Sequence, residues 1–273
     1  MAATQSVTLS NGVEMPVLGL GTWQMFDHIE AKKTILTAIE AGYRHIDTAA
    51  FYQNEEAVGE AVRECGIDRK EMFIVTKLWN PDHGYEKALK AFDTSMRKLK
   101  ADYLDLYLVH WPNELNKETW KALEKLYKDG AVRAIGVSNF LKHHIVELLP
   151  DCEIKPMVNQ FEFHPYLVQP ELLNYCHEQN IQPEAWSPLM QGNLTDVPLL
   201  AELAKKYNRT PAQIVLRWDV QLNIVTIPKS SNPGRIKSNL DIFSFELADE
   251  DIKRISELDK FKRFGPDPDN FDF

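Results

Sequence analysis

Short apolar runs alternate along the chain with longer segments in which apolar residues recur at helical spacing. The short runs predict β-strands, because each is brief and is bounded by polar or turn-forming residues. The predicted strands lie at residues 16–21, 44–49, 72–77, 104–110, 133–139, 156–162, 182–187 and 224–229. The longer segments predict helices at Glu30–Ala41, Glu55–Cys65, Tyr85–Lys98, Lys117–Lys128, Lys142–Leu149 and Glu171–Glu178. Two further helices, Pro211–Asp219 and Pro233–Asn239, open on a proline, which the first helical turn tolerates.

Strands that alternate with helices in this way predict the α/β class and a (β/α)8 TIM barrel. A doubly wound open sheet would need fewer strands. Asn11-Gly12 is a strong hairpin signal, so we expect an N-terminal β-hairpin cap over Val7–Pro16. Asp249–Leu258 predicts a last helix, and the X-Pro bonds in "FKRFGPDPDNFDF" predict a C-terminal extended tail over the barrel. Because no linker interrupts the pattern, residues 1–273 are expected to form a single (β/α)8 barrel domain.

Composition excludes several classes of partner. The 273 residues are 44% hydrophobic, which is enough for a large core, and the formal net charge is −9 without a long charged block. Phosphate backbones and anionic lipids need a concentrated basic face, so we expect neither nucleic acid nor membrane as a partner. The N-terminal "MAATQSVTLSNG" has no signal-peptide pattern, and no apolar run is long enough to span a bilayer. We expect a soluble, cytoplasmic protein.

Cysteine and histidine spacing predicts no metal site. Cys65, Cys152 and Cys176 are odd in number and widely spaced, which argues against a disulfide framework and a structural zinc, and favours a reducing compartment. His143 and His144 are adjacent in a predicted helix, and neighbours on a helix do not face each other. We therefore expect both rings to lie in solvent without a metal ion.

Polar or aromatic residues stand at the end of every predicted strand. In TIM barrels the carboxyl ends of the strands carry the chemistry, whereas the opposite ends serve stability. These strand-end residues are Gly21-Thr22-Trp23, Asp47, Lys77, His110, Ser138-Asn139, Gln160, Trp186-Ser187 and Lys229. Packing alone does not explain such a series.

Asp47, Lys77 and His110, together with Tyr52 in the loop after the second strand, predict a proton-transfer site. A phenol has a reference pKa of about 10, and a nearby ammonium is expected to lower the pKa of Tyr52. Asp47 would keep Lys77 charged and oriented, while His110 would hydrogen-bond a substrate carbonyl oxygen. The four groups suit protonation of a carbonyl oxygen while hydride reaches its carbon.

Three tryptophans, Trp23, Trp79 and Trp111, each follow a predicted strand end. We expect them to bind substrate with His110 by lining a carbonyl pocket. Packing at the barrel mouth is the alternative for each of them. Each remaining strand-end residue, taken alone, also has a structural explanation, such as a cap or a rim lysine.

Several motifs in order identify the chain as similar to the aldo-keto reductase superfamily over nearly its whole length. They are "LGLGTW", "GYRHIDTAAFYQNEEAVG", "VTKLW", "DLYLVHWP", "VRAIGVSNF", "VNQFEFHP", "WSPL", "TPAQIVLRW" and "IPKS....RI..N". This resemblance implies a catalytic tetrad of Asp47, Tyr52, Lys77 and His110, with Tyr52 as the general acid in reduction. It also implies a monomer that acts on a small-molecule carbonyl substrate. Members of similar appearance include diketogluconate reductases and a prostaglandin F synthase.

The cofactor implied by the resemblance is NADPH, bound without a Rossmann fold. "GLGTWQ" lacks the third glycine of the dinucleotide fingerprint, which agrees with that implication. By the same resemblance the cofactor contacts are Gly21, Thr22, Ser138, Asn139, Gln160, Trp186, Ser187, Leu189, Lys229, Ser230, Arg235 and Asn239. Among these, Ser138, Asn139 and Gln160 would bind the carboxamide and Trp186 would stack on the nicotinamide.

Lys229 and Arg235 stand beside Ser230 near the start of a predicted helix, an arrangement that favours a 2′-phosphate and hence NADP over NAD. Three positions depart from the family pattern. Trp186 replaces a common tyrosine, Met190 replaces a common glycine, and Ser238 replaces a frequent acidic residue.

Two other functions fit parts of the sequence. A Schiff-base barrel aldolase would use Lys77, but it needs a lysine of lowered pKa, whereas Asp47 would keep Lys77 charged. A nucleotide-binding, redox-sensing regulatory subunit would bind NADPH without turnover. For a reductase, the motifs leave small dicarbonyls, keto-sugars, aromatic aldehydes and lipid carbonyls or endoperoxides open as substrates.

Overall fold

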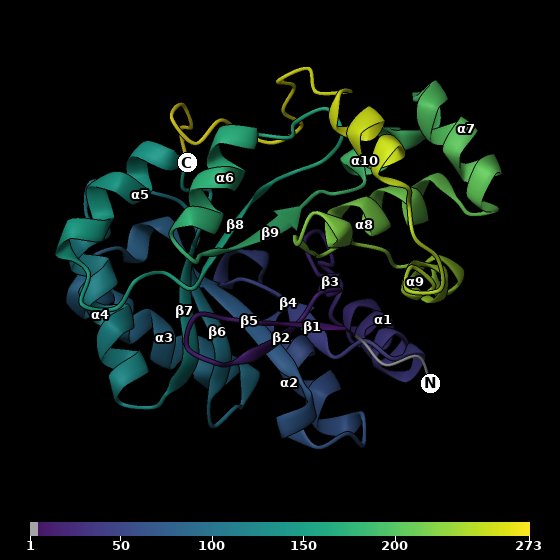
Figure 1. The fold of residues 1–273 in the computed structure, drawn as a ribbon. Helices are drawn as coiled ribbons and strands as arrows, with labels where there is room; N and C mark the ends of the chain where they lie inside the picture. The colour runs from purple at the N-terminus through teal and green to yellow at the C-terminus, as the bar shows by residue number, and fades with distance from the viewer. Residues whose placement is uncertain (1–4) are drawn as a thin grey trace.

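Eight parallel strands curl into a barrel in the computed structural model, which describes residues 5–273 (Figure 1). The strands are paired in chain order. They are β3 (Leu20–Gly21), β4 (His45–Asp47), β5 (Phe73–Leu78), β6 (Leu104–Val109), β7 (Val132–Ser138), β8 (Val158–Glu162), β9 (Gln182–Trp186) and β10 (Val225–Thr226). A parallel bridge between Leu18 and Thr226 joins the first strand to the last. The predicted (β/α)8 TIM barrel is confirmed.

Strand register brings the predicted site residues to one level of the barrel. Gly21 is opposite Asp47 on the β3–β4 pair, and Ser138 is opposite Gln160 on the β7–β8 pair. Lys77 of β5 is opposite Leu108, two residues before His110. Since the strands are parallel, their carboxyl ends form a single rim.

Helices surround the barrel (Figure 1). They are α1 (His28–Ala41), α2 (Glu55–Glu64), α3 (Tyr85–Leu99), α4 (Asn116–Lys128), α5 (Lys142–Leu148), α6 (Pro170–Glu178), α7 (Pro198–Tyr207), α8 (Pro211–Gln221), α9 (Pro233–Leu240) and α10 (Asp249–Ser256). Of these, α3, α4, α6 and α8 pack on strands, whereas α10 packs on α7. Sequence analysis did not predict α7. Its buried stripe is only Leu200, Leu203 and Ala204, and it shares one crossover with α8.

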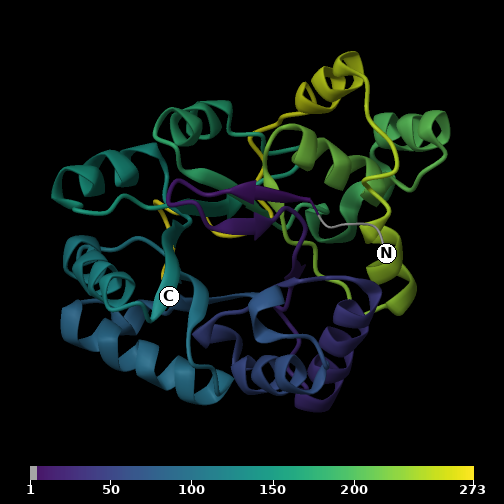
Figure 2. The same cartoon turned by 60° about the horizontal axis from the view of Figure 1, so that its bottom comes forward.

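A hairpin of β1 (Ser6–Thr8) and β2 (Glu14–Pro16) lies across the amino-terminal end of the barrel, as Figure 2 shows. Its turn reaches the start of β7, where Asn11 Nδ2 donates to the Arg133 carbonyl oxygen at 2.9 Å. The predicted hairpin cap is confirmed. It closes the end of the barrel opposite the rim that carries the predicted site.

The segment after α10 is extended, as predicted, and crosses the carboxyl ends of the strands toward α5 (Figure 1). Buried Glu162 of β8 fixes its middle, because Oε1 accepts hydrogen bonds from Phe264 N at 2.6 Å and Gly265 N at 3.2 Å. Asn80 Nδ2 donates to the Phe273 carbonyl oxygen at 3.0 Å. Within residues 5–273, no helix is both long and apolar enough to cross a membrane.

Candidate active site

A buried ion pair joins the ends of β4 and β5. Lys77 Nζ lies 2.6 Å from Asp47 Oδ1 and donates a second hydrogen bond to the Thr48 carbonyl oxygen at 2.9 Å. Burial alone would lower the pKa of Lys77, but the Asp47 carboxylate and Tyr52 outweigh it, so the pKa is raised. Lys77 is therefore a charged ammonium with one N–H left for a third partner.

Tyr52 lies at the end of a short 3-10 turn, Ala50–Tyr52, next to this pair. Its ring centroid is 5.0 Å from Lys77 Nζ. Asn54 holds the turn in place, because its side chain donates to the Thr22 carbonyl oxygen and accepts from Thr48 Oγ1. Sequence analysis did not identify Asn54, whose role is visible only when the loops after β3 and β4 meet.

The expected fall in the pKa of Tyr52 is wrong. Burial raises the pKa of the phenol, and the opposing effect of the Lys77 ammonium does not overcome it. The ammonium acts in the expected direction, but loss of solvent around the phenolate is the larger effect. Tyr52 is thus a protonated phenol in the resting protein. The Lys77 ammonium beside it partly offsets the cost of forming a buried phenolate.

His110 faces Tyr52 across the same space, with ring centroids 5.6 Å apart in an edge-to-face arrangement. Burial and the nearby Lys77 charge hold the pKa of His110 well below its ordinary value. Its Nδ1 has no hydrogen-bond partner among residues 5–273. A neutral imidazole donates a hydrogen bond but is no strong acid.

A cavity of about 320 Å³ opens above these groups at the carboxyl ends of the strands. Its lining includes most of the residues predicted for the site: Gly21, Trp23, Asp47, Tyr52, Trp79, His110, Trp111, Ser138, Asn139, Gln160, Trp186, Ser187 and Lys229. Lys77 is fully buried behind the Asp47 and Tyr52 side of the wall. The lining is mostly apolar, with a few convergent polar groups, as in small-molecule sites.

Aromatic rings form the outer wall of the cavity. Phe51, which sequence analysis missed, stacks between Trp23 and Trp79 with centroid separations of 5.4 Å and 4.0 Å. Phe273 of the tail stacks on Trp79 at 5.5 Å, and Trp111 lies 6% exposed beside it. The three predicted tryptophans therefore line the cavity and also pack at the barrel mouth.

Trp186 is held between the barrel and the tail. Its Nε1 donates to Asn139 Oδ1 at 2.8 Å, and Asn139 Nδ2 donates to the His110 carbonyl oxygen at 2.9 Å. Gly265 of the tail packs so closely on the indole that an added Cβ would lie 2.3 Å from Trp186 Cη2. The orientation of the Trp186 indole therefore depends on Gly265, a tail residue that could not be predicted from the ends of the strands.

Five of the predicted cofactor residues do not line the cavity: Thr22, Leu189, Ser230, Arg235 and Asn239. The Thr22 hydroxyl is buried and donates to the Asp47 carbonyl oxygen at 2.9 Å. Arg235 Nε donates to Ser230 Oγ at 3.3 Å at the start of α9. Lys229 and Arg235 are exposed, and neither forms an ion pair with any residue from 5 to 273. Two unneutralised cations beside a helix N-terminus fit a phosphate.

Met190 has a backbone φ of 51°, and Gln191 has 52°. The left-handed region favours glycine, which explains why a glycine is common at the position of Met190. The chain therefore adopts the strained loop conformation with a larger residue.

The expectation that His143 and His144 do not converge is wrong. His143 Nε2 lies 3.0 Å and His144 Nε2 lies 3.4 Å from the same Asp269 Oδ1 of the tail. They converge because the two ring centroids lie only 4.0 Å apart and the tail brings one carboxylate within reach of both. His144 Nδ1 accepts a hydrogen bond from Leu141 N at 3.1 Å, so Nε2 of the neutral ring carries the hydrogen. That tautomer donates to Asp269 and offers no lone pair to a metal ion.

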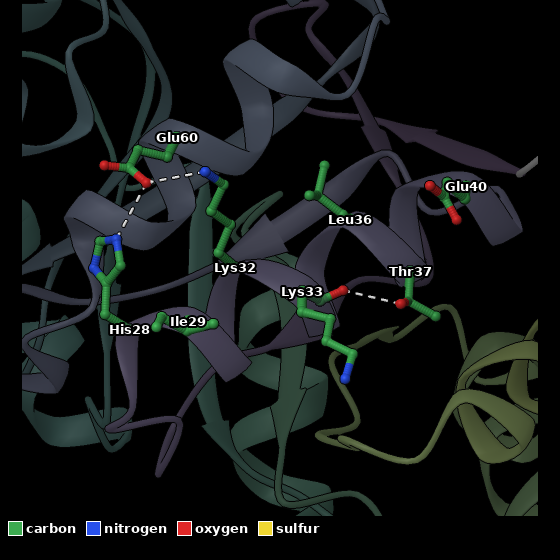
Figure 3. A pocket seen from close by; sticks show the side chains of 8 residues that line it. All are labelled: His28, Ile29, Lys32, Lys33, Leu36, Thr37, Glu40 and Glu60. Carbon is green, nitrogen blue, oxygen red and sulfur yellow. Dashed lines mark hydrogen bonds and ion pairs between the residues drawn. The ribbon is translucent and has the colours of Figure 1, made fainter.

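A second hollow, of about 480 Å³, lies over α1 and Glu60 of α2 (Figure 3). Glu60 is already paired with His28 at 3.1 Å and with Lys32 at 3.2 Å. Lys32 is also paired with Glu64 at 2.7 Å. The charges of this hollow neutralise one another, so it presents no concentrated chemistry.

Comparison with known proteins agrees with this geometry. A model of the aldo/keto reductase family matches residues 17–260. The chain is 56% identical to a glyoxal reductase of Bacillus subtilis, over 98% of each chain. It is 52% identical to a 9,11-endoperoxide prostaglandin H2 reductase of Trypanosoma cruzi, over 97% of this chain and 95% of that protein. The crystal structure of a Bombyx mori aldo-keto reductase in complex with NADP is 35% identical, with a TM-score of 0.93, covering 98% of this chain and 97% of the other. The chain is a member of the aldo/keto reductase family.

Proposed function

We propose that this protein is an NADPH-dependent reductase that converts aldehydes and ketones to alcohols, with Tyr52 as the general acid. One observation carries the proposal. The charged Lys77–Asp47 pair lies behind a protonated Tyr52 and a neutral His110, at the base of a cavity with aromatic walls. This donor set matches the needs of a carbonyl oxygen that gains negative charge.

NADPH, when bound, supplies the hydride. Its fit rests on Lys229 and Arg235, exposed cations without an ion pair among residues 5–273, and on the Ser230 hydroxyl, which accepts a hydrogen bond from Arg235 Nε at 3.3 Å. Ser138, Asn139 and Gln160 present amide and hydroxyl groups to the cavity next to Trp186, in the place proposed for the carboxamide and the nicotinamide. The remaining proposed cofactor contacts are Gly21, Thr22, Ser187 and Leu189. Asn239 is proposed to contact the adenine.

The proton step follows from the charges around Tyr52. A carbonyl oxygen that docks between Tyr52 and His110 receives two hydrogen bonds, and the Tyr52 proton moves to this oxygen as hydride reaches the carbon. The O–H bond of Tyr52 breaks and the O–H bond of the alcohol forms. The phenolate that remains lies beside the Lys77 ammonium, whose charge Asp47 maintains.

The raised pKa of Lys77 disfavours the alternative in which Lys77 forms a Schiff base, because an ammonium has no lone pair for attack. Incubation with borohydride and a carbonyl substrate would trap a Lys77 adduct in an aldolase. We expect no adduct by mass spectrometry.

Small dicarbonyls are the substrate class that we propose to test first, because of the 56% identity to a glyoxal reductase. The 52% identity to a prostaglandin endoperoxide reductase makes lipid endoperoxides the second class. Keto-sugars and aromatic aldehydes complete the panel. We further propose a single-domain, cytoplasmic monomer, which size-exclusion chromatography with light scattering tests.

Replacing Tyr52 with phenylalanine tests the central assignment. We expect Tyr52→Phe to lower kcat for glyoxal reduction by several decades while NADPH affinity, measured by calorimetry, changes less than threefold. Phe51→Leu is the matched control, because it alters the neighbouring ring without removing a hydroxyl. A near-normal kcat for Tyr52→Phe would exclude Tyr52 as the proton donor. Tight NADPH binding without turnover in wild type and variant would favour the regulatory alternative.

A further inference from the structure

A second carboxyl group lies inside the barrel next to the Asp47–Lys77 pair. Glu184 of β9 is fully buried, and Gln160 links it to Asp47. Gln160 Nε2 donates to Asp47 Oδ2 and to Glu184 Oε2, both at 2.9 Å. Because both N–H groups of this amide are used, the two carboxyl groups are joined through one nitrogen.

The other oxygen of Glu184 faces His45 of β4. His45 Nδ1 lies 3.2 Å from the Pro16 carbonyl oxygen, which only accepts, so Nδ1 carries the hydrogen of the neutral ring. His45 Nε2 then carries a lone pair and no hydrogen, and it lies 3.5 Å from Glu184 Oε1. Neither atom has a hydrogen-bond partner among residues 5–273. A single proton between them satisfies both atoms, whereas two facing lone pairs would repel.

Charge in the surrounding space favours the same protonation state. Lys77 is the cation nearest this carboxyl, and it is already paired with Asp47. Asp105, whose charge also acts on His45, is neutralised by Arg69 at 2.7 Å and Arg133 at 2.8 Å. Burial, and then the Asp47 charge, raises the pKa of Glu184 to about 8, while burial lowers the pKa of His45 to about 4.

We propose that Glu184 and His45 hold one shared proton beside the tetrad, and that this proton keeps Tyr52 acidic enough to act. When the proton leaves, a second negative charge stands next to Asp47. That charge raises the pKa of both Lys77 and Tyr52, so the Tyr52 phenol gives up its proton less readily. Glu184 and His45 are thus positioning residues, which touch no substrate and act through Gln160 and Asp47. The role in catalysis rests on the proposed function, whereas the shared proton does not.

The first test is spectroscopic and needs no turnover. Infrared difference spectra of wild type minus Glu184→Gln at pH 6 should contain the C=O stretch of a protonated carboxyl, and this band should disappear as pH rises through about 8. Asp219→Asn is the matched control, because Asp219 is a second buried carboxyl of strongly raised pKa, bonded to Thr226 on the outer side of the barrel. If no band is lost in Glu184→Gln, the shared proton is refuted. If that variant does not fold, the pH titration of the carboxyl band that remains in Asp219→Asn decides the same point, because Glu184 is intact there.

The second test measures the effect on Tyr52. The tyrosinate absorbance of wild type, Glu184→Gln and Asp219→Asn is measured against pH, each with and without Tyr52→Phe. The difference within each pair is the titration of Tyr52 alone. We expect Glu184→Gln, which fixes the neutral state, to move this titration to lower pH by on the order of one unit. Asp219→Asn should leave it in place. The pH profile of kcat for alcohol oxidation should move by the same amount if the proposed function holds. An unmoved Tyr52 titration in Glu184→Gln overturns the proposal, and absence of turnover in every protein overturns only the proposed function.

Discussion

Lys77 Nζ lies 2.6 Å from Asp47 Oδ1, and the structure buries both side chains completely or nearly so. A buried ion pair contributes little net stability, but breaking it by removing one partner typically costs ~3–5 kcal/mol. Net stability therefore does not account for the pair, which supports the catalytic role proposed for Lys77.

Lys77→Met should lower kcat by several decades and also lower the free energy of unfolding, because it leaves the Asp47 carboxylate buried without a cation. The double variant Asp47→Asn with Lys77→Met removes both charges, so it should regain most of the lost stability without regaining kcat. Urea unfolding and steady-state kinetics on the same preparations check both parts. Recovery of kcat in the double variant would contradict a catalytic role for the ammonium.

Lys229→Ala combined with Arg235→Ala should weaken NADPH far more than NADH, because only NADPH has a 2′-phosphate for these cations to bind. The expected loss for NADPH is at least tenfold in Kd by calorimetry, with a change for NADH of less than threefold. Lys237→Ala removes an exposed cation of the same helix and serves as the control. Equal losses for both cofactors would refute the 2′-phosphate assignment.

Gly265→Ala should displace the Trp186 indole, since the added Cβ would lie 2.3 Å from Cη2. We expect NADPH affinity to fall several-fold in the wild-type background. In a Trp186→Phe background the outer ring is absent, so adding Gly265→Ala should have little further effect. Additive losses in the double variant would show that the contact between tail and indole does not matter for the cofactor.

Asp269→Ala should loosen the tail, because it removes the acceptor shared by His143 and His144. Phe273 packs on Trp79 farther along the same segment, so we expect KM for the carbonyl to change several-fold while kcat changes little. Hydrogen exchange at residues 264–273 should become faster. Asp272→Ala removes the same charge from an exposed position of the tail and should leave both measurements unchanged.

Strand-end residues could be predicted from the sequence because the carboxyl ends of parallel strands must share one rim. This alone places Asp47, Lys77, His110 and Gln160 together, whatever the loops do. Three features could not be predicted in this way. The tail contacts of Gly265 and Asp269 join positions far apart in the chain, and α7 has too narrow an apolar stripe to stand out.

Glu184 illustrates a different limit. Its acidic side chain in a buried strand, "QPEAWS", is a signal that sequence analysis passed over. The partner of that side chain depends on which strand residues point inward at the same layer. His45 and Asp47 do so because they are two residues apart on β4. The predicted fall in the pKa of Tyr52 was wrong for a related reason. The degree of burial follows from packing and not from the identity of the neighbouring residues.

The barrel closes through its two shortest strands. β3 and β10 each contain two residues, and their junction consists of hydrogen bonds such as Gly19 N to the Thr226 carbonyl oxygen at 2.9 Å and Gly21 N to the Pro228 carbonyl oxygen at 3.2 Å. Gly21 and Lys229 border the cavity on either side of this seam. A molecule that fills the cavity would touch both sides of this junction, so its binding is expected to stabilise the closed barrel.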